Sequence, residues 1–354
     1  MLPPPERSFA SDNTAGIAGP VLDAIVAAND GAAVAYGADP FTERFTAQIH
    51  DLFGPEATPL LTWGGTGANI VALASLVQPY QAVICPASSH IAVDECGGPE
   101  RFLGSKLIDV ATTDGKLRPA DVEEQLGVLG VVHHAQPGAI SITQVTETGQ
   151  VYSLDELADL CAVAKGAGLR VHMDGARIAN AAAALDLPVK HFTADIGVDV
   201  LSFGATKNGI AYGEAVVLFD PSLVEAARFH QKQAAQLPSK MRFVAAQLSA
   251  LLENDLWLEH GRQANAMAQL LAKGAADIPG IEITQAVQAN AVFAKLPRAV
   301  VQRLQAWTWF YVWQAAPAGE ADPVDEVRWM TSFATTSDDV QRFLDGVAHE
   351  MTNG

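Results

Sequence analysis

The order of apolar and polar positions along the chain predicts strands that alternate with helices. Short apolar runs rich in β-branched residues, bounded by glycine, proline or hydroxyl residues, are typical of buried strands. Such runs are Leu60 to Trp63, Gln81 to Cys85, Lys106 to Val110, Ala139 to Gln144, the run from Leu169, Val198 to Phe203, and Glu214 to Phe219. Between them, segments such as Phe41 to Phe53 carry apolar residues at helical spacing. This alternation predicts an α/β fold class built on an open sheet.

Beyond Pro221 the pattern becomes mainly helical, with helices predicted over Pro221 to Gln233 and Ser239 to Ala276. Strands follow at Ala291 to Leu296, Trp309 to Gln314 and Glu326 to Phe333, with helices between and after them. This second pattern is typical of a small α+β domain. We therefore predict a large α/β domain over residues 14–245. The small domain takes residues 246–354 together with an N-terminal arm, residues 1–13.

Composition narrows the class of protein. The chain has 354 residues, of which 49% are hydrophobic and 18% charged, as in ordinary globular proteins. Its 40 acidic against 22 basic residues give a net charge of −18, which disfavours nucleic acid and anionic membranes as partners. We expect no signal peptide and no transmembrane segment, because the proline-rich start and the short apolar runs match neither. The three cysteines lack disulfide or metal-binding spacing, so we expect a cytoplasmic enzyme without a metal.

Lys207 is the most informative residue, because it stands alone at the end of a predicted buried strand. It is the only charged residue between Asp199 and Glu214. The residues around it are small or carry hydroxyls: Ser202, Gly204, Thr206, Gly209 and Gly213. Desolvation favours the neutral amine of a lysine, which can then attack a carbonyl carbon. This is the setting of a Schiff-base lysine, and the alternative is an ordinary surface lysine in a loop.

A second stretch also places charged residues at the end of a predicted strand. The predicted strand from Leu169 ends at Asp174 and Arg177, with Gly175 at the turn into a helix. An aspartate and a lysine that end two strands would converge on the crevice where open α/β sheets bind ligands. A carboxylate can keep a pyridine nitrogen protonated while a lysine carries an aldehyde. Asp174 and Lys207 therefore form the pairing that pyridoxal phosphate (PLP) requires.

The glycine-rich loop Gly64–Gly67 joins a predicted strand to a predicted helix that runs from Ala68 to Val77. Glycines let backbone amides approach an anion, and the helix N-terminus adds the positive end of its dipole. Turns of this kind are common in proteins. Taken alone, the loop is only a candidate cradle for a phosphate.

Two further residues have both a functional and a structural interpretation. His90 follows small residues after the strand Gln81 to Cys85, where its ring could lie flat against a cofactor or could serve only the fold. Arg328 lies in an otherwise apolar and aromatic strand. A buried guanidinium needs a carboxylate partner, which is either structural or belongs to an incoming substrate.

These motifs together resemble a known family. Asp174 lies in His-Met-Asp-Gly-Ala-Arg and Lys207 in Ser-Phe-Gly-Ala-Thr-Lys-Asn-Gly, and the glycine loop and Ser-Ser-His at Ser88 accompany them. The sequence is similar to the low-specificity L-threonine aldolase family, in the beta-eliminating lyase branch of fold type I PLP enzymes. The resemblance runs from the motif at Phe9 to the motif at Val327, nearly the whole chain. It implies an aspartate-aminotransferase-like fold, with a large and mostly parallel sheet.

The resemblance also implies how the cofactor, pyridoxal 5'-phosphate, is held. Lys207 would bind it as a covalent Schiff base, and Asp174 would keep its ring nitrogen protonated. Backbone groups of Gly65, Thr66 and Gly67 would hold its phosphate. Beside Asp174, Arg177 could donate to the phenolic oxygen of the cofactor.

For the substrate, the resemblance implies four residues. His90 would stack on the pyridine ring and is a candidate for proton transfer. His133 would face the β-hydroxyl of the substrate, although its loop could slip by one residue. Arg328 and Ser11 would bind the substrate carboxylate. The catalytic base stays open between His90, His133 and a water that they hold.

The reaction implied is a retro-aldol cleavage. The Cα–Cβ bond of L-threonine, L-allo-threonine or a related β-hydroxy-α-amino acid such as phenylserine would break to give glycine and an aldehyde. Rivals are a β-eliminating lyase or an aminotransferase of the same fold, or a non-catalytic PLP-binding protein, which intact Lys207, Asp174 and His90 argue against. The Ala-Thr-Lys-Asn-Gly context of Lys207 departs from the shorter Ser-Lys context of many members, which leaves substrate preference open.

We expect a homo-oligomer, dimer or tetramer, whose active site lies at a dimer interface. Arg228, Lys232, Lys240 and Arg242 form a local excess of positive charge in an acidic chain. A solvated helix face is the ordinary interpretation. The resemblance implies that one basic residue of this region reaches the phosphate of the neighbouring subunit, with Lys232 and Arg242 as candidates.

Overall fold

The computed structural model describes residues 3–352, so the ends of the predicted arm 1–13 and of the predicted small domain lie partly outside the described residues. Its larger sheet has the strand order β1-β7-β6-β5-β4-β2-β3. The strands are β1 (Thr58–Thr62), β2 (Gln81–Pro86), β3 (Lys106–Val110), β4 (Gln136–Thr143), β5 (Arg170–Gly175), β6 (Val200–Phe203) and β7 (Glu214–Leu218). Strand β7 is antiparallel to β1 and β6, and the other neighbouring pairs are parallel. The predicted α/β class with a mostly parallel sheet is confirmed.

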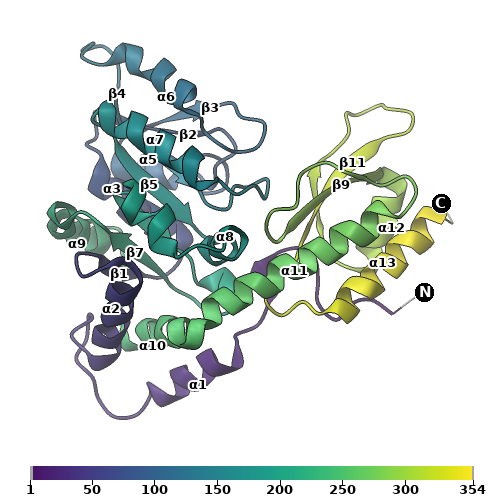
Figure 1. Cartoon of the computed structure of the whole chain (residues 1–354), viewed down its shortest axis with the longest axis horizontal. Helices are drawn as coiled ribbons and strands as arrows, with labels where there is room; N and C mark the ends of the chain where they lie inside the picture. Colours follow the sequence, from purple (N-terminus) through teal and green to yellow (C-terminus); the bar gives the residue numbers. More distant parts are fainter. Residues whose placement is uncertain (1–2, 353–354) are drawn as a thin grey trace.

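Helices cover both faces of this sheet and make three layers (Figure 1). One face packs against α1 (Gly19–Ala27), α2 (Pro40–Phe53), α6 (Pro119–Gln125), α7 (Leu154–Gly166), α8 (Ile178–Leu185) and α10 (Arg242–Leu252). The other packs against α3 (Gly65–Leu76), α4 (His90–Val93), α5 (Gly98–Leu103) and α9 (Val224–Gln233). Because apolar side chains cover both faces, the strands are continuous apolar runs rather than alternating ones.

Local signals explain where these helices begin. Asp39 caps α2 by accepting a hydrogen bond from the backbone of Thr42, and Pro40 occupies the first helical position. Ser153 and Glu156 form the reciprocal capping box that opens α7. Helix α3 differs, because its cap is Gly64 and no side chain satisfies its first amides. Those amides therefore remain available at the edge of the sheet.

The smaller sheet is antiparallel, in the order β10-β11-β9-β8, and packs against long helices (Figure 1). Its elements are β8 (Glu282–Ile283), β9 (Ala291–Pro297), β10 (Tyr311–Gln314), β11 (Val324–Met330), α11 (Leu256–Ala276), α12 (Arg298–Trp307) and α13 (Ser337–Thr352). Phe9 of the N-terminal arm is fully buried in this core, and its ring lies 4.4 Å from that of Phe343. The arm therefore packs with the small domain.

Short 3₁₀ turns connect many of these elements. They are η1 (Asp12–Thr14), η2 (Leu126–Val128), η3 (Val189–Phe192), η4 (Ala194–Ile196), η5 (Thr206–Asn208), η6 (Pro221–Leu223) and η7 (Glu253–Asp255). Two of them, η1 and η5, carry residues of the candidate site that is described below.

The predicted helix Ser239 to Ala276 is two helices, which corrects the sequence-based boundary. Turn η7 separates α10 from α11, because Asn254 and Asp255 adopt left-handed conformations with φ of 53° and 57°. Asparagine and aspartate tolerate this conformation better than other side chains, and a helix cannot pass through it.

Helix α11 links the two domains (Figure 1). Trp257 at its start packs in the core of the large sheet, whereas Ala268, Leu271 and Ala275 pack in the core of the small sheet. Val244, Ala245, Leu248, Ala250 and Leu251 of α10 belong to the core of the large sheet. The change from one core to the other therefore lies along α11. None of the helices in residues 3–352 combines the length and the apolarity needed to cross a bilayer.

We predict that Gly261→Ala destabilises the protein. Gly261 lies where α11 crosses α8, and an ideal Cβ there would lie 2.5 Å from the backbone oxygen of Ala179. The two helices would have to separate, at a cost of about 1–3 kcal/mol in the free energy of unfolding. Gly166→Ala in α7 is the matched control, because nothing lies within 4 Å of its Cβ position. Denaturant unfolding measures both; equal stabilities would contradict the tight crossing.

Candidate active site

The C-terminal ends of β5 and β6 meet the N-terminus of α3 around a pocket of about 240 Å³. Sequence-predicted residues in its wall are Gly65, Thr66, His90, Asp174 and Lys207. Asn13, Trp63, Gly64, Ala68, Ala176, Ser202, Gly204, Thr206, Tyr212 and Glu214 complete the lining. Residues from five separate stretches of the chain therefore converge at one edge of the sheet, as the sequence predicts.

Lys207 lies in η5, directly after β6. The chain can turn there because Gly204 passes against the backbone of Ala176, where an ideal Cβ would lie 2.5 Å from its carbonyl oxygen. Among the described residues the Lys207 amine has no hydrogen-bond partner. Burial lowers the pKa of Lys207, and the nearby Arg177 guanidinium lowers it further. The neutral, nucleophilic amine is thus favoured relative to a lysine in water.

Glu214, at the start of β7, holds the loop that carries Lys207. Its Oε2 accepts a hydrogen bond from the backbone N–H of Ala205 at 2.5 Å. Burial raises the pKa of Glu214 to about 7, while the hydrogen bonds from Ala205 and Thr206 oppose that rise. Glu214 also lines the pocket, so a titratable carboxyl group lies beside the lysine.

Asp174 is held by two hydrogen bonds. Its Oδ2 accepts from Nδ2 of Asn69 on α3, and its Oδ1 accepts from the backbone N–H of Ala176, both at 2.9 Å. The residue is only 5% exposed, and these bonds fix the direction of its carboxylate at the pocket wall. A carboxylate held in this way is suited to bind a protonated ring nitrogen.

A chain of hydrogen bonds joins Asp174 to His90. The same amide of Asn69 also donates to Oε1 of Glu95 at 2.9 Å, and that oxygen lies 2.8 Å from Nδ1 of His90. The Glu95 side chain is fully buried, whereas that of His90 is 41% exposed and lines the pocket. The hydrogen bond with Glu95 raises the pKa of His90 against the effect of burial. Glu95 therefore orients the ring from behind.

The glycine loop serves two purposes. Nothing lies within 4 Å of the Cβ positions of Gly64 and Gly65, so the approach to the first amides of α3 is open. Gly67 does not line the pocket, and an ideal Cβ there would collide with the side-chain amide of Gln236. Gln236 also accepts a hydrogen bond from the backbone N–H of Trp63 at 3.1 Å. The loop thus offers an anion-binding helix end and a tight contact with the segment that follows α9.

Arg177 forms a buried ion pair with Asp12 of η1. Its Nε and NH2 atoms donate to the two carboxylate oxygens at 2.7 and 2.9 Å. Lys207 and Arg177 together hold the pKa of Asp12 below its usual value against its burial. Ser11, the preceding residue, accepts a hydrogen bond from the backbone of Asn13, which lines the pocket. The N-terminal arm therefore reaches the pocket through Asn13, and neither Ser11 nor Asp12 lines it.

Arg328 lies on β11 next to this ion pair. Its guanidinium carbon lies 5.2 Å from the ring centre of Trp313 and 5.9 Å from that of Tyr311. Its Nε is buried and has no hydrogen-bond partner among residues 3–352. No carboxylate within residues 3–352 forms an ion pair with Arg328, so the structural partner considered from the sequence is not seen there. A buried donor without a partner is expected to receive one from a ligand.

His133 does not line this pocket of its own chain. It is exposed, in the turn before β4 begins at Gln136. Strand β4 has eight residues and runs parallel to β5, so its far end is about 26 Å away, at the pocket edge. Within its own chain His133 thus precedes a strand whose other end faces the pocket, and its role stays a prediction.

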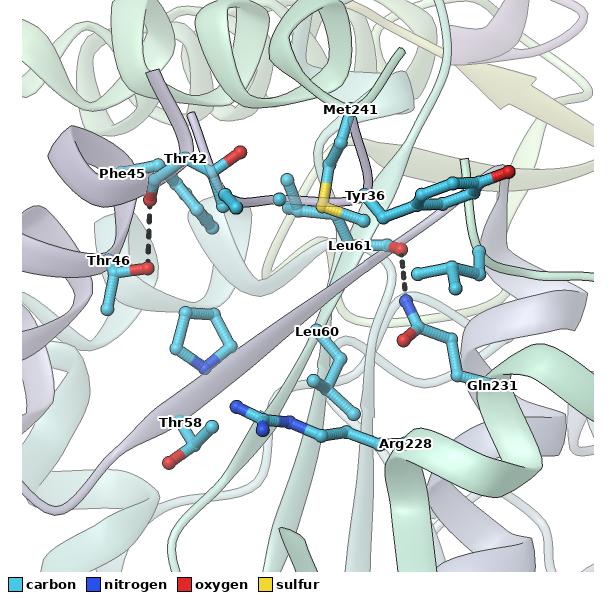
Figure 2. Close-up of a pocket in the computed structure, with 14 residues that line it drawn as sticks. Tyr36, Thr42, Phe45, Thr46, Thr58, Leu60, Leu61, Arg228, Gln231 and Met241 are labelled. Carbon is cyan, nitrogen blue, oxygen red and sulfur yellow. Dashed lines mark hydrogen bonds between the residues drawn. The ribbon is translucent and has the colours of Figure 1, made fainter. Parts of the chain in front are cut away.

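A larger cavity of about 440 Å³ lies beside the edge strand β1, between α2 and α9 (Figure 2). Leu60, Leu61 and Met241 make its wall largely apolar, and the side chain of Gln231 is tied to the backbone oxygen of Leu61 at 2.7 Å. Arg228 is the one charged residue among those that line it. Its lining holds Tyr36 and three threonines besides Arg228, but no aspartate, glutamate, histidine, cysteine or lysine.

Sequence reasoning missed several residues of the site. Asn69, Glu95 and Glu214 reach it from α3, from the turn after α4 and from β7. Asp12 was within the motif at Ser11, and its neighbour Asn13 lines the pocket. The available signal was position, since each of these residues lies within a few residues of a recognised motif. Within residues 3–352 no group of three or more histidine, cysteine or carboxylate side chains is arranged to hold a metal ion.

Comparisons with known proteins agree with this geometry. The model of the beta-eliminating lyase family matches residues 8–297. A low specificity L-threonine aldolase from Pseudomonas sp. is 43% identical over 307 residues, which are 86% of this chain and 89% of that protein. The solved structure of Leishmania major threonine aldolase superposes with a TM-score of 0.91 at 30% identity, over 97% of this chain and 99% of that one.

More distant structures show the fold alone. The Oryza sativa protein titled TDC with PLP and tryptamine has a TM-score of 0.76 at 14% identity, over 98% of this chain and 84% of that one. Its likeness agrees with the large sheet and small C-terminal domain described above. From the family match and the long alignment with the Pseudomonas protein, the chain belongs to the beta-eliminating lyase family, in its threonine aldolase branch.

Proposed function

We propose that the protein is a PLP-dependent aldehyde-lyase of the low-specificity threonine aldolase type. It cleaves L-threonine, L-allo-threonine and related β-hydroxy-α-amino acids to glycine and an aldehyde. The observation that carries this proposal is the placement of Lys207 and Asp174 on neighbouring strand ends in one pocket. The family and the similarity to named threonine aldolases support the substrate class.

The residues present fit such a cofactor. The Lys207 amine has no hydrogen-bond partner within residues 3–352 and a lowered pKa, as a carbonyl-binding lysine needs. The first amides of α3 have no side-chain cap, and the space around Gly64 and Gly65 is open for a phosphate. Asp174 offers an oriented carboxylate for a protonated ring nitrogen. When bound, PLP supplies an electron sink for the pair released from the Cα–Cβ bond.

Each of these residues would then have a separate role in binding the cofactor. Lys207 would bind the aldehyde carbon of the cofactor, and Gly65 and Thr66 would bind its phosphate. Asp174 would hold a proton at the ring nitrogen. His90, oriented by Glu95, would cover the ring.

Substrate binding falls to groups from the arm and the small domain. The unpaired Nε of Arg328 is available for a substrate carboxylate, with Ser11 nearby on the arm. The ion pair between Arg177 and Asp12 holds the N-terminal arm against the loop that follows Asp174. An absorbance spectrum of the purified protein, followed by an assay of glycine release from a panel of β-hydroxy amino acids, tests the proposal. A protein that binds PLP but releases pyruvate or ammonia instead would be a β-eliminating lyase or an aminotransferase.

We predict that Lys207→Ala removes the visible absorbance band of the lysine-bound cofactor. Glycine release should fall by about 10³ or more, roughly 4 kcal/mol of barrier. The fold should persist, because the Lys207 side chain makes no hydrogen bond within the described chain. Lys190→Ala is the control, since that lysine pairs at the surface with Asp195. A Lys207→Ala protein that cleaves threonine at the original rate would refute the assignment.

We predict that Asp174→Asn retains the cofactor but loses activity. The amide cannot hold the proton of a pyridinium nitrogen, so kcat should fall at least about tenfold, or 1.4 kcal/mol. Asp109→Asn provides the comparison, because Asp109 also lies near the end of a parallel strand but is exposed and outside the pocket. If Asp174→Asn changes kcat by less than that factor, another group serves the ring nitrogen.

We propose that the enzyme is a homo-oligomer whose active sites lie at a dimer interface. Trp63 and Tyr212 line the pocket and are 45% and 40% exposed, with their ring centres 5.8 Å apart. Large apolar side chains are also exposed on neighbouring elements: Leu22 and Val26 on α1, Tyr36, and Phe229 on α9. Exposed apolar groups around a pocket are typical of a surface that another chain covers.

The positions of Lys232 and Arg242 are compatible with an active site at a dimer interface. Lys232 lies with its amine 5.2 Å from the ring centre of Tyr36, and Arg242 donates to the backbone oxygens of Asp30 and Gly31. Neither lines the pocket of its own chain. A two-fold partner could bring either of them to a phosphate in the neighbouring site.

We predict that inactive variants complement each other when mixed. One carries Lys207→Ala and the other a change at Lys232 or Arg242. In a hybrid dimer one site keeps both groups intact, so part of the activity should return, as measured by glycine release after subunit exchange. Exchange is verified independently with differently tagged chains. A monomer that is active at assay concentration, detected by light scattering, would refute the interface.

A further inference from the structure

The two faces of the smaller sheet carry different side chains. Val292, Val327 and Trp329 pack in the core that the sheet forms with α11, α12 and α13. Successive residues of a strand point to opposite faces, so Phe293 on β9 and Arg328 on β11 lie on the other face. These two residues are register partners in the antiparallel β9–β11 pair. The second face of the sheet therefore places a guanidinium beside an aromatic ring.

The edge strand β10 adds two more rings to this face. Tyr311 is the register partner of Arg328, and its ring centre lies 5.9 Å from the guanidinium carbon. The register shifts by one residue after Val312, and Trp313 is the extra residue of the resulting bulge. The ring centre of Trp313 lies 5.2 Å from the guanidinium carbon and 5.3 Å from the ring centre of Phe293. Aromatic side chains from the two strands that flank β11 thus surround Arg328.

The charge of Arg328 is held without a carboxylate. Its Nε is buried and has no hydrogen-bond partner within residues 3–352, and no carboxylate in that range forms an ion pair with it. Burial lowers the pKa of Arg328 and the nearby Arg177 lowers it further, while Asp12 opposes the change. Aromatic faces attract a guanidinium without neutralising its charge. The rings of Tyr311 and Trp313 are therefore the groups that stabilise this cation in its position.

Rings and carboxylates differ in what they leave free. A structural carboxylate would occupy the N–H donors of Arg328 and compete with a substrate for them. A ring contacts the face of the guanidinium, so the donors in its plane stay available. The ion pair of Asp12 and Arg177 acts on the pKa of Arg328 and also on that of Lys207, which lines the pocket. Arg328 therefore lies close enough to the pocket to attract a carboxylate that enters it.

We propose that Trp313 and Tyr311 are positioning residues, which hold the Arg328 guanidinium by its face and keep its donors free for the substrate carboxylate. The inference rests on the proposed function, in which Arg328 receives that carboxylate. Trp313 has the larger effect, because its ring is nearer and because indole binds cations more strongly than phenol. The carboxylate takes no part in the bond changes of the reaction. Loss of a ring should therefore raise KM and leave kcat nearly unchanged.

The decisive variant is Trp313→Leu, which keeps an apolar side chain but removes the aromatic face. We expect KM for L-threonine and the dissociation constant of glycine to rise about tenfold, with kcat within about threefold of the original. Glycine binding is followed by the change in cofactor absorbance. Ethanolamine, an amine without a carboxylate, should bind equally to variant and original protein. Tyr80→Leu is the control, because Tyr80 is 67% exposed and does not line the pocket.

Further variants separate the aromatic face from packing. Trp313→Phe retains a ring and should raise the dissociation constant of glycine by less than about threefold. Tyr311→Leu is a second test that does not depend on the folding of Trp313→Leu, and should raise that constant about threefold. Tyr311→Phe removes only the hydroxyl and should bind glycine like the original protein. The Tm of each variant, measured without cofactor, verifies that the fold is intact.

The outcomes distinguish this inference from the proposed function. If Trp313→Leu and Tyr311→Leu bind glycine as tightly as the original protein, the rings do not position Arg328 and the inference is wrong. It is also wrong if Trp313→Phe weakens glycine binding as much as Trp313→Leu, or if ethanolamine binding falls equally. If the original protein binds glycine but cleaves no β-hydroxy amino acid, the proposed function fails, while glycine binding still decides the role of Trp313.

Discussion

The buried ion pair between Asp12 and Arg177 joins the three parts of the molecule that form the site. Asp12 belongs to the N-terminal arm and Arg177 follows β5 of the large sheet. From the small domain, Asn290 donates to the same carboxylate at 3.0 Å. Removing one partner of a buried pair leaves an uncompensated charge, at a cost of about 3–5 kcal/mol. The arm, the sheet and the small domain are therefore held in one relative position, and Arg328 is brought next to the pocket as a result.

Burial away from water also shifts the pKa values of side chains in the pocket. Burial lowers the pKa of Lys207 and raises the pKa of Glu214 to about 7, so both side chains shift toward their neutral forms. Arg177 adds to the shift of the lysine, while Asp12 cancels most of the positive charge that Arg177 brings. A nucleophilic amine and a tight ion pair can then lie close together. Backbone groups bind Asp174 and Glu214, while the side chains of Asn69 and Glu95 orient Asp174 and His90.

Features that depend on local sequence could be predicted. The apolar runs gave the strands of the large sheet, and the capping box at Ser153 gave the start of α7, because each is decided by neighbouring residues. The break between α10 and α11 could not, since Asn254 and Asp255 are also acceptable inside a helix and only packing selects their left-handed conformation. Glu95 and Asn69 were missed because a polar residue is usually solvated, and only the fold places Asn69 against Asp174 and Glu95 against His90.

The direction of the strands explains which of the predicted residues line the pocket of their own chain and which do not. In a parallel sheet the two ends of the strands are not equivalent, and ligands bind at the carboxyl ends. His90 and Lys207 follow the strands that position them and Asp174 lies at the end of its own strand, whereas His133 precedes its strand and does not line the pocket of its own chain. Glu147, which follows β4, lies behind the pocket wall and accepts a hydrogen bond from the backbone N–H of His90. The order of residue and strand along the chain thus carries more information about this site than the residue type alone.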